Sequence, residues 1–285
     1  MSDFVRQNAV ATDFATSDSW VILSPIEQSI KRKIEAIGTP LKDWDIQINY
    51  GIKTGYNEAF IITTEKRDEI LSNCADEDER KRTDELIRPI LRGRDIKRYG
   101  YDWADLWLIN THNGIKGKLD RIRIEDYPAV KAHLDQYWNK ISTRADKGDT
   151  PYNLRNCAYL DDFSKPKIVW KRIGSILRFS YDDRGCFGLD STCFASGSQL
   201  VYLTCVLKSK IGHYLLKDSP CTGTGDLLIS VQAIEPLMIP MASNDSFEEL
   251  LCRILSGSKD AETNAFHAIS DLYGFNREER EYILM

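Results

Sequence analysis

The sequence contains no run of apolar residues that approaches the roughly 18 needed for a membrane-spanning helix. Its first twenty residues also lack the basic start and the apolar stretch of a secretory signal peptide, and we interpret them as a flexible lead-in. Both absences lead us to expect a cytoplasmic protein. With 285 residues, of which 42% are hydrophobic and 28% charged, the chain is long enough to bury a sizeable core.

Cysteine pairs at metal-ligand spacing are also missing. The chain has seven cysteines, an odd number, and no two of them form a C-x-x-C pair. This pattern argues against a disulfide framework and against a zinc cluster. It is typical of reduced thiols that serve as small apolar side chains.

A basic overall composition is missing as well, because the formal net charge is −5. The acidic excess lies in residues 245–285, which hold nine acidic and four basic residues. Positive charge is concentrated elsewhere: residues 86–100 carry five basic residues and one acidic residue, and residues 163–178 carry five basic residues and no acidic one. Two local basic patches on a neutral body are compatible with an anionic partner such as nucleic acid.

Periodicity and capping signals in the first half predict a mixture of helices and strands. Ser24 and Glu27 form an S-x-x-E box ahead of a helix over residues 25–37. Residues 45–50 and 59–63 are interpreted as the two strands of a hairpin, joined by a turn over residues 51–57. Residues 106–110 predict a short strand, and Pro128 opens an amphipathic helix.

The second half predicts another hairpin, over residues 167–172 and 175–181 around Gly174. Residues 199–216 fit a helix or a strand, and we favour the helix. A glycine loop at residues 221–226 is followed by an extended segment at 231–241. After a linker, three short helices follow, with capping boxes at Ser246 and Asn276 for the first and the third. The predicted class is α+β with a short helical C-terminal tail.

Several segments, taken in order, resemble the TaqI-like C-terminal specificity domain. They are GIKTGYNEAFIIT (51–63), IRPILRGRDIKRY (87–99), WLI (107–109), DYP…HL (126–134), KPKIVWKRI (165–173), VYLTCVLKSKIGHYLL (201–216), IEPLMIPM (234–241) and the tail AISDLYGFNREEREYIL. Together they cover nearly the whole chain after Trp20. This family forms the target recognition part of type IIG restriction-modification enzymes and of related adenine-N6 DNA methyltransferases.

The resemblance implies a division of labour between domains. An upstream methyltransferase domain would bind S-adenosylmethionine and flip the target adenine, and a nuclease domain can precede it. This chain shows neither module, so we expect it to be no enzyme by itself and to hold no cofactor or metal. Residues 21–242 would be the DNA target recognition domain. Residues 243–285 would be a helical tail that docks on the methyltransferase or on the recognition domain.

The basic run at residues 92–99 is the strongest candidate for DNA contact. Arginine can bind phosphate through two hydrogen bonds or read guanine in the major groove, and Gly93 lets the backbone approach a bulky partner. Asp95 would position Arg94 or Arg98. A solvated surface turn held by ion pairs is the alternative interpretation of this run. The full candidate set comprises Lys53, Thr54, Tyr56, Asn57, Arg92, Arg94, Lys97, Arg98, Tyr99, Lys171, Arg172, Thr222 and Thr224.

Three further segments contribute to that set, and each has a second interpretation. The 53–57 turn offers amide, ammonium and ring groups for DNA, or it is a hairpin turn kept for its geometry. Lys171 and Arg172 lie near a hairpin tip that could enter a groove, while Trp170 is either a core residue or a contact. The 222–226 loop could offer backbone amides to a phosphate, although it lacks the spacing of a nucleotide-binding loop.

Two rival functions differ from DNA recognition by class. In the first, the acidic helical tail makes the chain a protein-docking module with weak DNA binding outside a complex. In the second, the chain is a nuclease or methyltransferase. That would require a cluster of metal-binding carboxylates or an S-adenosylmethionine loop, and we find neither motif in the sequence.

Overall fold

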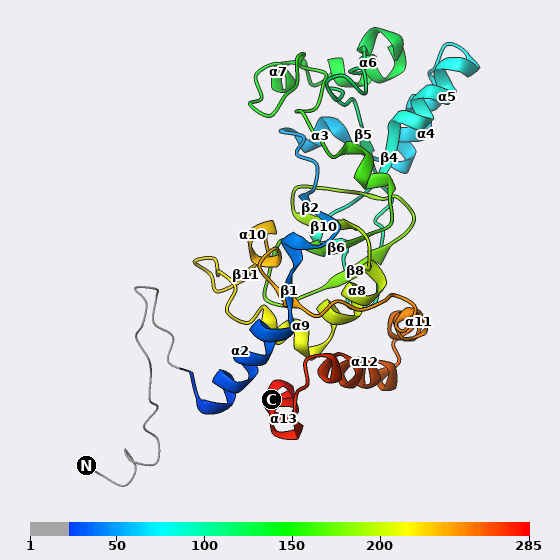
Figure 1. The fold of residues 1–285 in the computed structure, drawn as a ribbon. Helices are drawn as coiled ribbons and strands as arrows, with labels where there is room; N and C mark the ends of the chain where they lie inside the picture. The colour runs from blue at the N-terminus through cyan, green and yellow to red at the C-terminus, as the bar shows by residue number, and fades with distance from the viewer. Residues whose placement is uncertain (1–22) are drawn as a thin grey trace.

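A four-stranded antiparallel sheet lies at the centre of the computed structural model, which describes residues 23–285 (Figure 1). The predicted lead-in at residues 1–20 lies outside the described residues. The strand order is β2 (Ile46–Tyr50), β10 (Thr192–Gly197), β6 (Lys167–Lys171) and β8 (Phe179–Asp182). The β6–β8 pair confirms the pairing predicted for the second hairpin, with Lys167 opposite Asp182 and Trp170 opposite Phe179. The return strand begins at Phe179, later than predicted, because residues 173–174 pair with residues 227–228.

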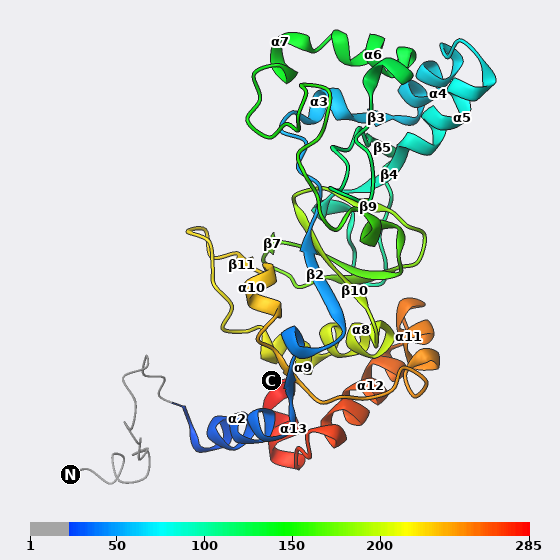
Figure 2. The ribbon, with the colours of Figure 1, turned by 45° about the horizontal axis from the view of Figure 1, so that its top comes forward.

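Both faces of this central sheet are buried, each in a different hydrophobic core. In β6 and β10, side chains that alternate along the strand point to opposite faces. Ile168 and Trp170 contribute to one core together with Ala195, whereas Val169 and Phe194 contribute to the other. The sheet is therefore a wall between two lobes, which Figure 2 shows above and below it.

The lower lobe is helical and includes the C-terminal tail. Its elements are α2 (Pro25–Ile37), β1 (Thr39–Pro40), η1 (Leu41–Asp43), α8 (Leu200–Lys208), α9 (Lys210–Leu215), α10 (Val231–Ile234), β12 (Met238–Ile239), α11 (Glu248–Leu255), α12 (Lys259–Leu272) and α13 (Arg277–Leu284). Strand β1 pairs antiparallel with β12. The tail helices insert Leu251, Ile254 and Ile269 into the core that also holds Ile30 and Leu203. Their apolar faces are thus covered by the rest of the same chain.

The upper lobe is built on a second four-stranded sheet, in the order β3 (Ile61–Thr63), β5 (Leu106–Ile109), β4 (Ile87–Leu91) and β9 (Phe187–Gly188). Only the β4–β9 pairing is parallel. The surrounding helices are α3 (Asn57–Phe60), α4 (Thr64–Ser72), α5 (Glu77–Leu86), η3 (Ile124–Asp126), α6 (Pro128–Asp135), α7 (Trp138–Ile141) and η4 (Leu160–Ser164). The predicted α+β class, with a helical C-terminal end, is confirmed.

Two of the three predicted capping boxes are present in the structure. Helix α2 has the predicted box, with Ser24 and Glu27 bonded reciprocally. Helix α13 has the predicted box from Asn276 to Glu279. The box predicted at Ser246 is wrong, because α11 begins at Glu248 and Phe247 at its N-cap makes no side-chain cap. Residues 199–216, for which we favour a helix, form two helices, α8 and α9, which are separated at Ser209, where the backbone is extended.

Two strand assignments are wrong because tertiary pairing overrides local alternation. The supposed hairpin partners at residues 45–50 and 59–63 lie in different sheets: β2 pairs with β10, and β3 pairs with β5. Helix α3 (Asn57–Phe60) takes in residues 59 and 60, the first two of that supposed return strand. The segment at 231–241, expected to be extended, begins with helix α10, and only Met238–Ile239 forms a strand.

A buried ion pair links the central sheet to the upper lobe. Lys167 and Asp182 are both 0% exposed, and the Lys167 ammonium donates to Asp182 and, at 2.7 Å, to the carbonyl of Phe163. The Asp182 carboxylate also accepts the Tyr101 hydroxyl at 2.7 Å and the amide of Cys186 at 3.1 Å. With every polar group paired, the cluster holds β8, β6 and the segment around residue 101 in one arrangement.

We expect Asp182→Ala to destabilise the protein by about 3–5 kcal/mol, because the Lys167 charge would remain buried without its partner. Urea denaturation measures this loss. The control is Lys165→Ala, which removes the more exposed pair of Lys165 with Asp162 (2.7 Å) and should cost about 1 kcal/mol or less. The double variant Lys167→Met/Asp182→Leu should recover most of the stability. Equal effects of the two single substitutions would contradict this assignment.

Candidate nucleic-acid interface

One end of the central sheet gathers segments that are far apart in the sequence. Register places Tyr50 opposite Cys193 and Thr192 opposite Lys171. The amide of Gly51 donates to the carbonyl of Thr192 at 3.0 Å. The chain therefore leaves β2, enters β10 and leaves β6 at the same end of the sheet. We call this end, where the three strands begin or finish, the sheet edge.

The Arg92 turn packs against this sheet edge. It is the 3-10 turn η2 (Gly93–Asp95), which follows directly after β4. The Gly93 amide donates to the Ser191 hydroxyl at 3.0 Å, and a Cβ atom at Gly93 would lie 2.8 Å from the Ser191 carbonyl oxygen and 2.9 Å from Cγ of Lys171. Glycine is required there by the chain's own approach. We had expected Gly93 to admit a bulky external partner.

Arg92 is held inside the protein by Asp95. Its Nε donates to Oδ2 of Asp95 at 3.0 Å, its Nη2 to Oδ1 at 2.8 Å, and its backbone amide to Oδ2 at 2.8 Å. Asp95 is 4% exposed, and its hydrogen bonds raise the pKa of Arg92. Asp95 thus positions Arg92, whereas we had predicted that it would position Arg94 or Arg98.

Arg94, in contrast, is exposed and has no ion pair within residues 23–285. Lys97 donates to the carbonyl of Arg94 at 3.0 Å. Arg98 reaches the tail and makes two hydrogen bonds to Glu262 of α12, at 2.8 and 3.1 Å. The Tyr99 ring lies 5.2 Å from the Arg98 guanidinium and 5.8 Å from Nζ of Lys208. Most cations of the basic run therefore have partners inside the protein, and Arg94 is the one whose guanidinium is exposed and unpaired within the described residues.

Lys171 and Arg172 lie between the Arg92 turn and the glycine loop. Strand β7 (Ile173–Gly174) pairs with β11 (Leu227–Leu228), and the Ile229 amide donates to the Arg172 carbonyl at 2.8 Å. Lys171 is exposed and forms no ion pair within the described part of the chain, whereas Nε of Arg172 is buried without a partner there. Trp170 is 1% exposed and donates to the Ile229 carbonyl at 2.9 Å, so it is a core residue.

The glycine loop is a tight turn beside this hairpin. The Thr222 amide donates to the Asp226 carbonyl at 2.8 Å, and the Gly225 amide donates to the Thr222 carbonyl at 2.9 Å. The hydroxyls of Thr222 and Thr224 lie 2.8 Å apart and share a hydrogen bond. Thr224 is exposed, and so is Cys221 at the start of the loop. The loop thus carries hydroxyls at the Gly174 end of the β7–β11 pair, beside the strand that follows Lys171 in the chain.

The 53–57 turn lies on the upper lobe, away from these segments. Lys53 forms an ion pair with Asp146 at 2.8 Å. Thr54 is buried, and its hydroxyl donates to Oδ1 of Asn57 at 2.6 Å. The Tyr56 ring packs 6.1 Å from the Tyr137 ring. The structure connects this turn to the sheet edge only through Gly51 and Ile52.

Sequence reasoning missed two residues of the sheet edge. Ser191 joins the Arg92 turn to the hairpin, because its hydroxyl accepts from Gly93 and its carbonyl accepts from the Arg172 amide at 3.0 Å. Cys221 is exposed at the glycine loop. An isolated serine after Gly188-Leu-Asp190 and an unpaired cysteine carry no local signal, so only tertiary placement reveals them.

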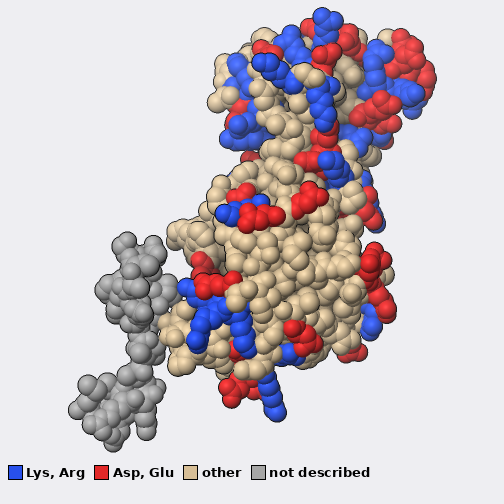
Figure 3. All heavy atoms as spheres, viewed as in Figure 1, with Lys and Arg blue, Asp and Glu red and all other residues tan. Residues whose placement is uncertain are grey.

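Charge is distributed unevenly over the surface. Figure 3 shows basic and acidic side chains intermingled over the upper lobe, while the face of the central region in that view is mostly free of charged residues. Among the described residues, no three His, Cys, Asp or Glu side chains come together as a metal ion would require. No helix within residues 23–285 has the length and apolarity to cross a bilayer.

The chain's fold is similar to part of restriction-modification enzymes. Type IIL MmeI, whose structure was solved in complex with DNA, superposes with a TM-score of 0.60 at 13% identity, over 87% of this chain and 37% of MmeI. The type IIG endonuclease BpuSI gives a TM-score of 0.46 at 14% identity, over 90% of this chain and 33% of BpuSI. The chain thus spans about a third of these proteins' length. Its sequence matches no protein-family model and no curated protein.

The contrast between Arg92 and Arg94 can be measured directly. We expect Arg92→Ala to lower the free energy of unfolding by about 1–3 kcal/mol, because the buried Asp95 carboxylate would lose two hydrogen bonds. Arg94→Ala should change it by about 0.5 kcal/mol or less, since the side chain is exposed and unpaired. Urea denaturation of both variants gives the comparison. If Arg94→Ala proved the more destabilising, the two assigned roles would be wrong.

Proposed function

We propose that this chain is a sequence-specific module for recognising double-stranded DNA in a restriction-modification system. Three observations support this: the family resemblance of the sequence, the similarity of the fold to part of MmeI, and the sheet edge. The sheet edge carries the proposal within this molecule. It joins two exposed, unpaired cations from distant segments, Arg94 and Lys171, to the hydroxyl-bearing loop at Thr222 and Thr224.

The roles of these side chains follow from their chemistry. A flexible, exposed lysine such as Lys171 suits a phosphate, whereas the guanidinium of Arg94 can bind phosphate or read guanine O6 and N7 through two hydrogen bonds. Arg92 is a positioning residue, because its Nε and Nη2 donate to Asp95. Thr222 and Thr224 would donate to phosphate oxygens, contacts that fix the register of a protein on its duplex.

The remaining candidates would act from the two sides of this edge. Lys53 and Asn57 would reach DNA from the upper lobe, and Lys53 would have to exchange its ion pair with Asp146 for a phosphate. Arg98 and Lys97 would need similar exchanges, because Arg98 pairs with Glu262 and Lys97 lies 3.8 Å from the Asp102 carboxylate. Because such exposed pairs are weak, a phosphate can replace the carboxylate at small cost.

We also propose which enzyme this chain would direct to DNA. The TaqI-like resemblance supports an adenine-N6 DNA methyltransferase as the partner domain or subunit, with S-adenosylmethionine bound there. A nuclease domain can complete such a system. Recognition by this chain would help to offset the few kcal/mol that flipping the target adenine costs. In this proposal the chain itself supplies specificity and no chemistry.

The sheet edge can be tested with a charge-matched pair of variants. A randomised duplex library, selected on the wild-type chain at low salt, first yields the preferred sequence. Arg94→Ala/Lys171→Ala should then weaken binding of that duplex by at least about tenfold and reduce the slope of log affinity against log salt by about two. The control Arg32→Ala/Lys42→Ala removes two positive charges from α2 and η1 and should leave both quantities nearly unchanged.

The outcomes separate the proposal from its rival. An enriched motif with an adenine, lost in the Arg94/Lys171 variant, supports target recognition at the sheet edge. Equal losses in the control variant would show that only net charge matters and would contradict the assignment. No binding by any variant would favour the rival protein-docking function, in which DNA is bound only in a complex.

Two exposed cysteines provide an independent footprint. Cys221 begins the glycine loop at the sheet edge, and Cys252 lies on α11 in the tail. We expect the selected duplex to slow alkylation of Cys221 by iodoacetamide several-fold, because bound DNA would cover the loop, and to leave Cys252 unaffected. Peptide mass spectrometry follows both thiols in one sample. Unchanged labelling of Cys221 under saturating DNA would remove this loop from the interface.

A further inference from the structure

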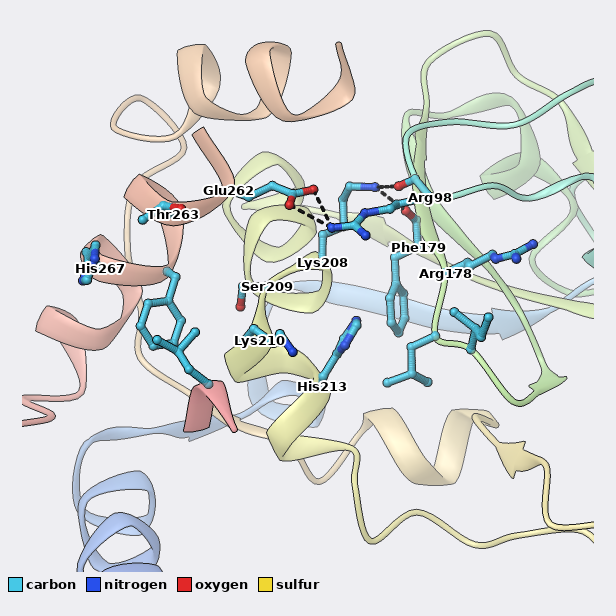
Figure 4. A pocket seen from close by; sticks show the side chains of 14 residues that line it. Arg98, Arg178, Phe179, Lys208, Ser209, Lys210, His213, Glu262, Thr263 and His267 are labelled. Carbon is cyan, nitrogen blue, oxygen red and sulfur yellow. Dashed lines mark hydrogen bonds and ion pairs between the residues drawn. The ribbon is translucent and has the colours of Figure 1, made fainter. Parts of the chain in front are cut away.

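A cavity of about 590 Å³ lies between the central sheet and the tail. Its walls come from the loop before β8, the junction of α8 with α9, α12, and Leu284 at the end of α13 (Figure 4). This volume is within the ~300–1,000 Å³ typical of small-molecule sites. The cavity is separate from the Arg94 and Lys171 side chains, neither of which lines it.

The cavity holds more positive than negative charge. Its cationic lining residues are Arg98, Arg178, Lys208 and Lys210, and its only acidic lining residue is Glu262. Arg98 already neutralises that carboxylate through two hydrogen bonds. Lys210, Arg178 and Lys208 make no ion pair within residues 23–285. The excess of charge favours an anion.

Of the two lysines in the cavity lining, only Lys208 is partly buried. Its ammonium donates to the carbonyls of Arg98 and Phe179, the latter at 3.0 Å, and no carboxylate lies within ion-pair distance among the described residues. The pKa of Lys208 is lowered to about 8, mainly by burial; the Glu262 carboxylate opposes this shift and the nearby Arg98 adds to it. A partly buried ammonium without a counterion is costly, and an anion in the cavity would relieve that cost.

The remaining wall is mostly apolar and includes two imidazole rings, those of His213 and His267. Ile176, Leu177, Phe179, Phe266 and Leu284 line the cavity, and Ile176 is 60% exposed and Leu284 46%. Figure 4 shows His213 beside Lys210 on α9, with its imidazole directed toward the Phe179 side of the space. An apolar wall next to several cations suits a ligand that has both a ring system and an anionic group.

We propose that this cavity binds a nucleoside phosphate, with the phosphate near Lys208 and Lys210 and the base against His213 and the apolar wall. A phosphate monoester carries a charge of about −1.5 to −2 at pH 7, which matches several unpaired cations better than a single carboxylate does. A free nucleotide supplies this monoester, whereas a nucleotide within a DNA strand would offer its base together with a singly charged phosphodiester. The site does not involve Arg94 or Lys171, and Arg98 is the one DNA-contact candidate that also lines it.

The test is calorimetric titration of the full chain with AMP, with inorganic phosphate and with a short single-stranded oligonucleotide, at low salt. AMP should bind at one site per chain. Lys210→Ala should weaken it by about tenfold through loss of a charge-assisted hydrogen bond, and Glu262→Gln should strengthen it by removing the competing carboxylate. Lys259→Ala, which removes a charge from α12 outside the cavity lining, is the control and should have no effect.

Proton uptake provides a second readout, because binding of the anion to exposed surface charges would not change the protonation of Lys208. A bound anion stabilises the charged form of Lys208 and raises its pKa from about 8, so the protein should take up protons on binding near pH 8. The binding heat should then vary with the ionisation enthalpy of the buffer. Lys208→Met should abolish that variation.

Each outcome decides the proposal. Saturable AMP binding with the expected effects of both charge variants supports it. Binding of the oligonucleotide but not of AMP also supports it, provided that Lys210→Ala weakens that binding; the nucleotide would then belong to a DNA strand. Inorganic phosphate binding as tightly as AMP would overturn the role of the apolar wall. No binding of any probe at millimolar concentration, or equal loss in Lys259→Ala, would overturn the site.

Discussion

The burial of both faces of the central sheet is the constraint on which the rest of the structure depends. In β6 and β10 every residue in the strand interior faces one core or the other. A shift of the strand register by one residue would therefore move the side chains of each core into the opposite one. Trp170 and Val169, neighbours in sequence, belong to different lobes for this reason. The register fixed in this way brings Tyr50, Thr192 and Lys171 to one end of the sheet.

The sheet edge inherits its geometry from that register. The Arg92 turn is held there by Gly93, Asp95 and Ser191, which use their polar groups inside the protein. This internal bonding leaves Arg94 and Lys171 exposed on either side of Ser191. Within the basic run, Arg92 therefore holds the turn through Asp95, whereas Arg94 remains available to a partner. The proposed interface depends on this division more than on the number of basic residues.

Much of the local structure could be predicted from the sequence, and the failures share one cause. Helix α2, the β6–β8 hairpin and the capping box of α13 have strong short-range signals that tertiary contacts do not oppose. The first hairpin was wrong because β2 finds its partner about 150 residues later, in β10. In the candidate site, the segments were identified but the roles were not. Arg98 binds Glu262, 164 positions away, and the conformation of the 3-10 turn directs Asp95 to Arg92 and not to Arg94 or Arg98.

The sequence by itself determined the α+β class, the helical tail, the basic segments and the family resemblance, because these depend on periodicity, capping and the order of motifs. Only the tertiary structure decided which cations are free, that Ser191 joins the Arg92 turn to the Lys171 hairpin, and that Lys208 faces a cavity closed by the tail. The physical reason is that hydrogen bonds and ion pairs select partners by distance in space. Residues such as Arg98 and Glu262, 164 positions apart, become neighbours only when two cores form around one sheet.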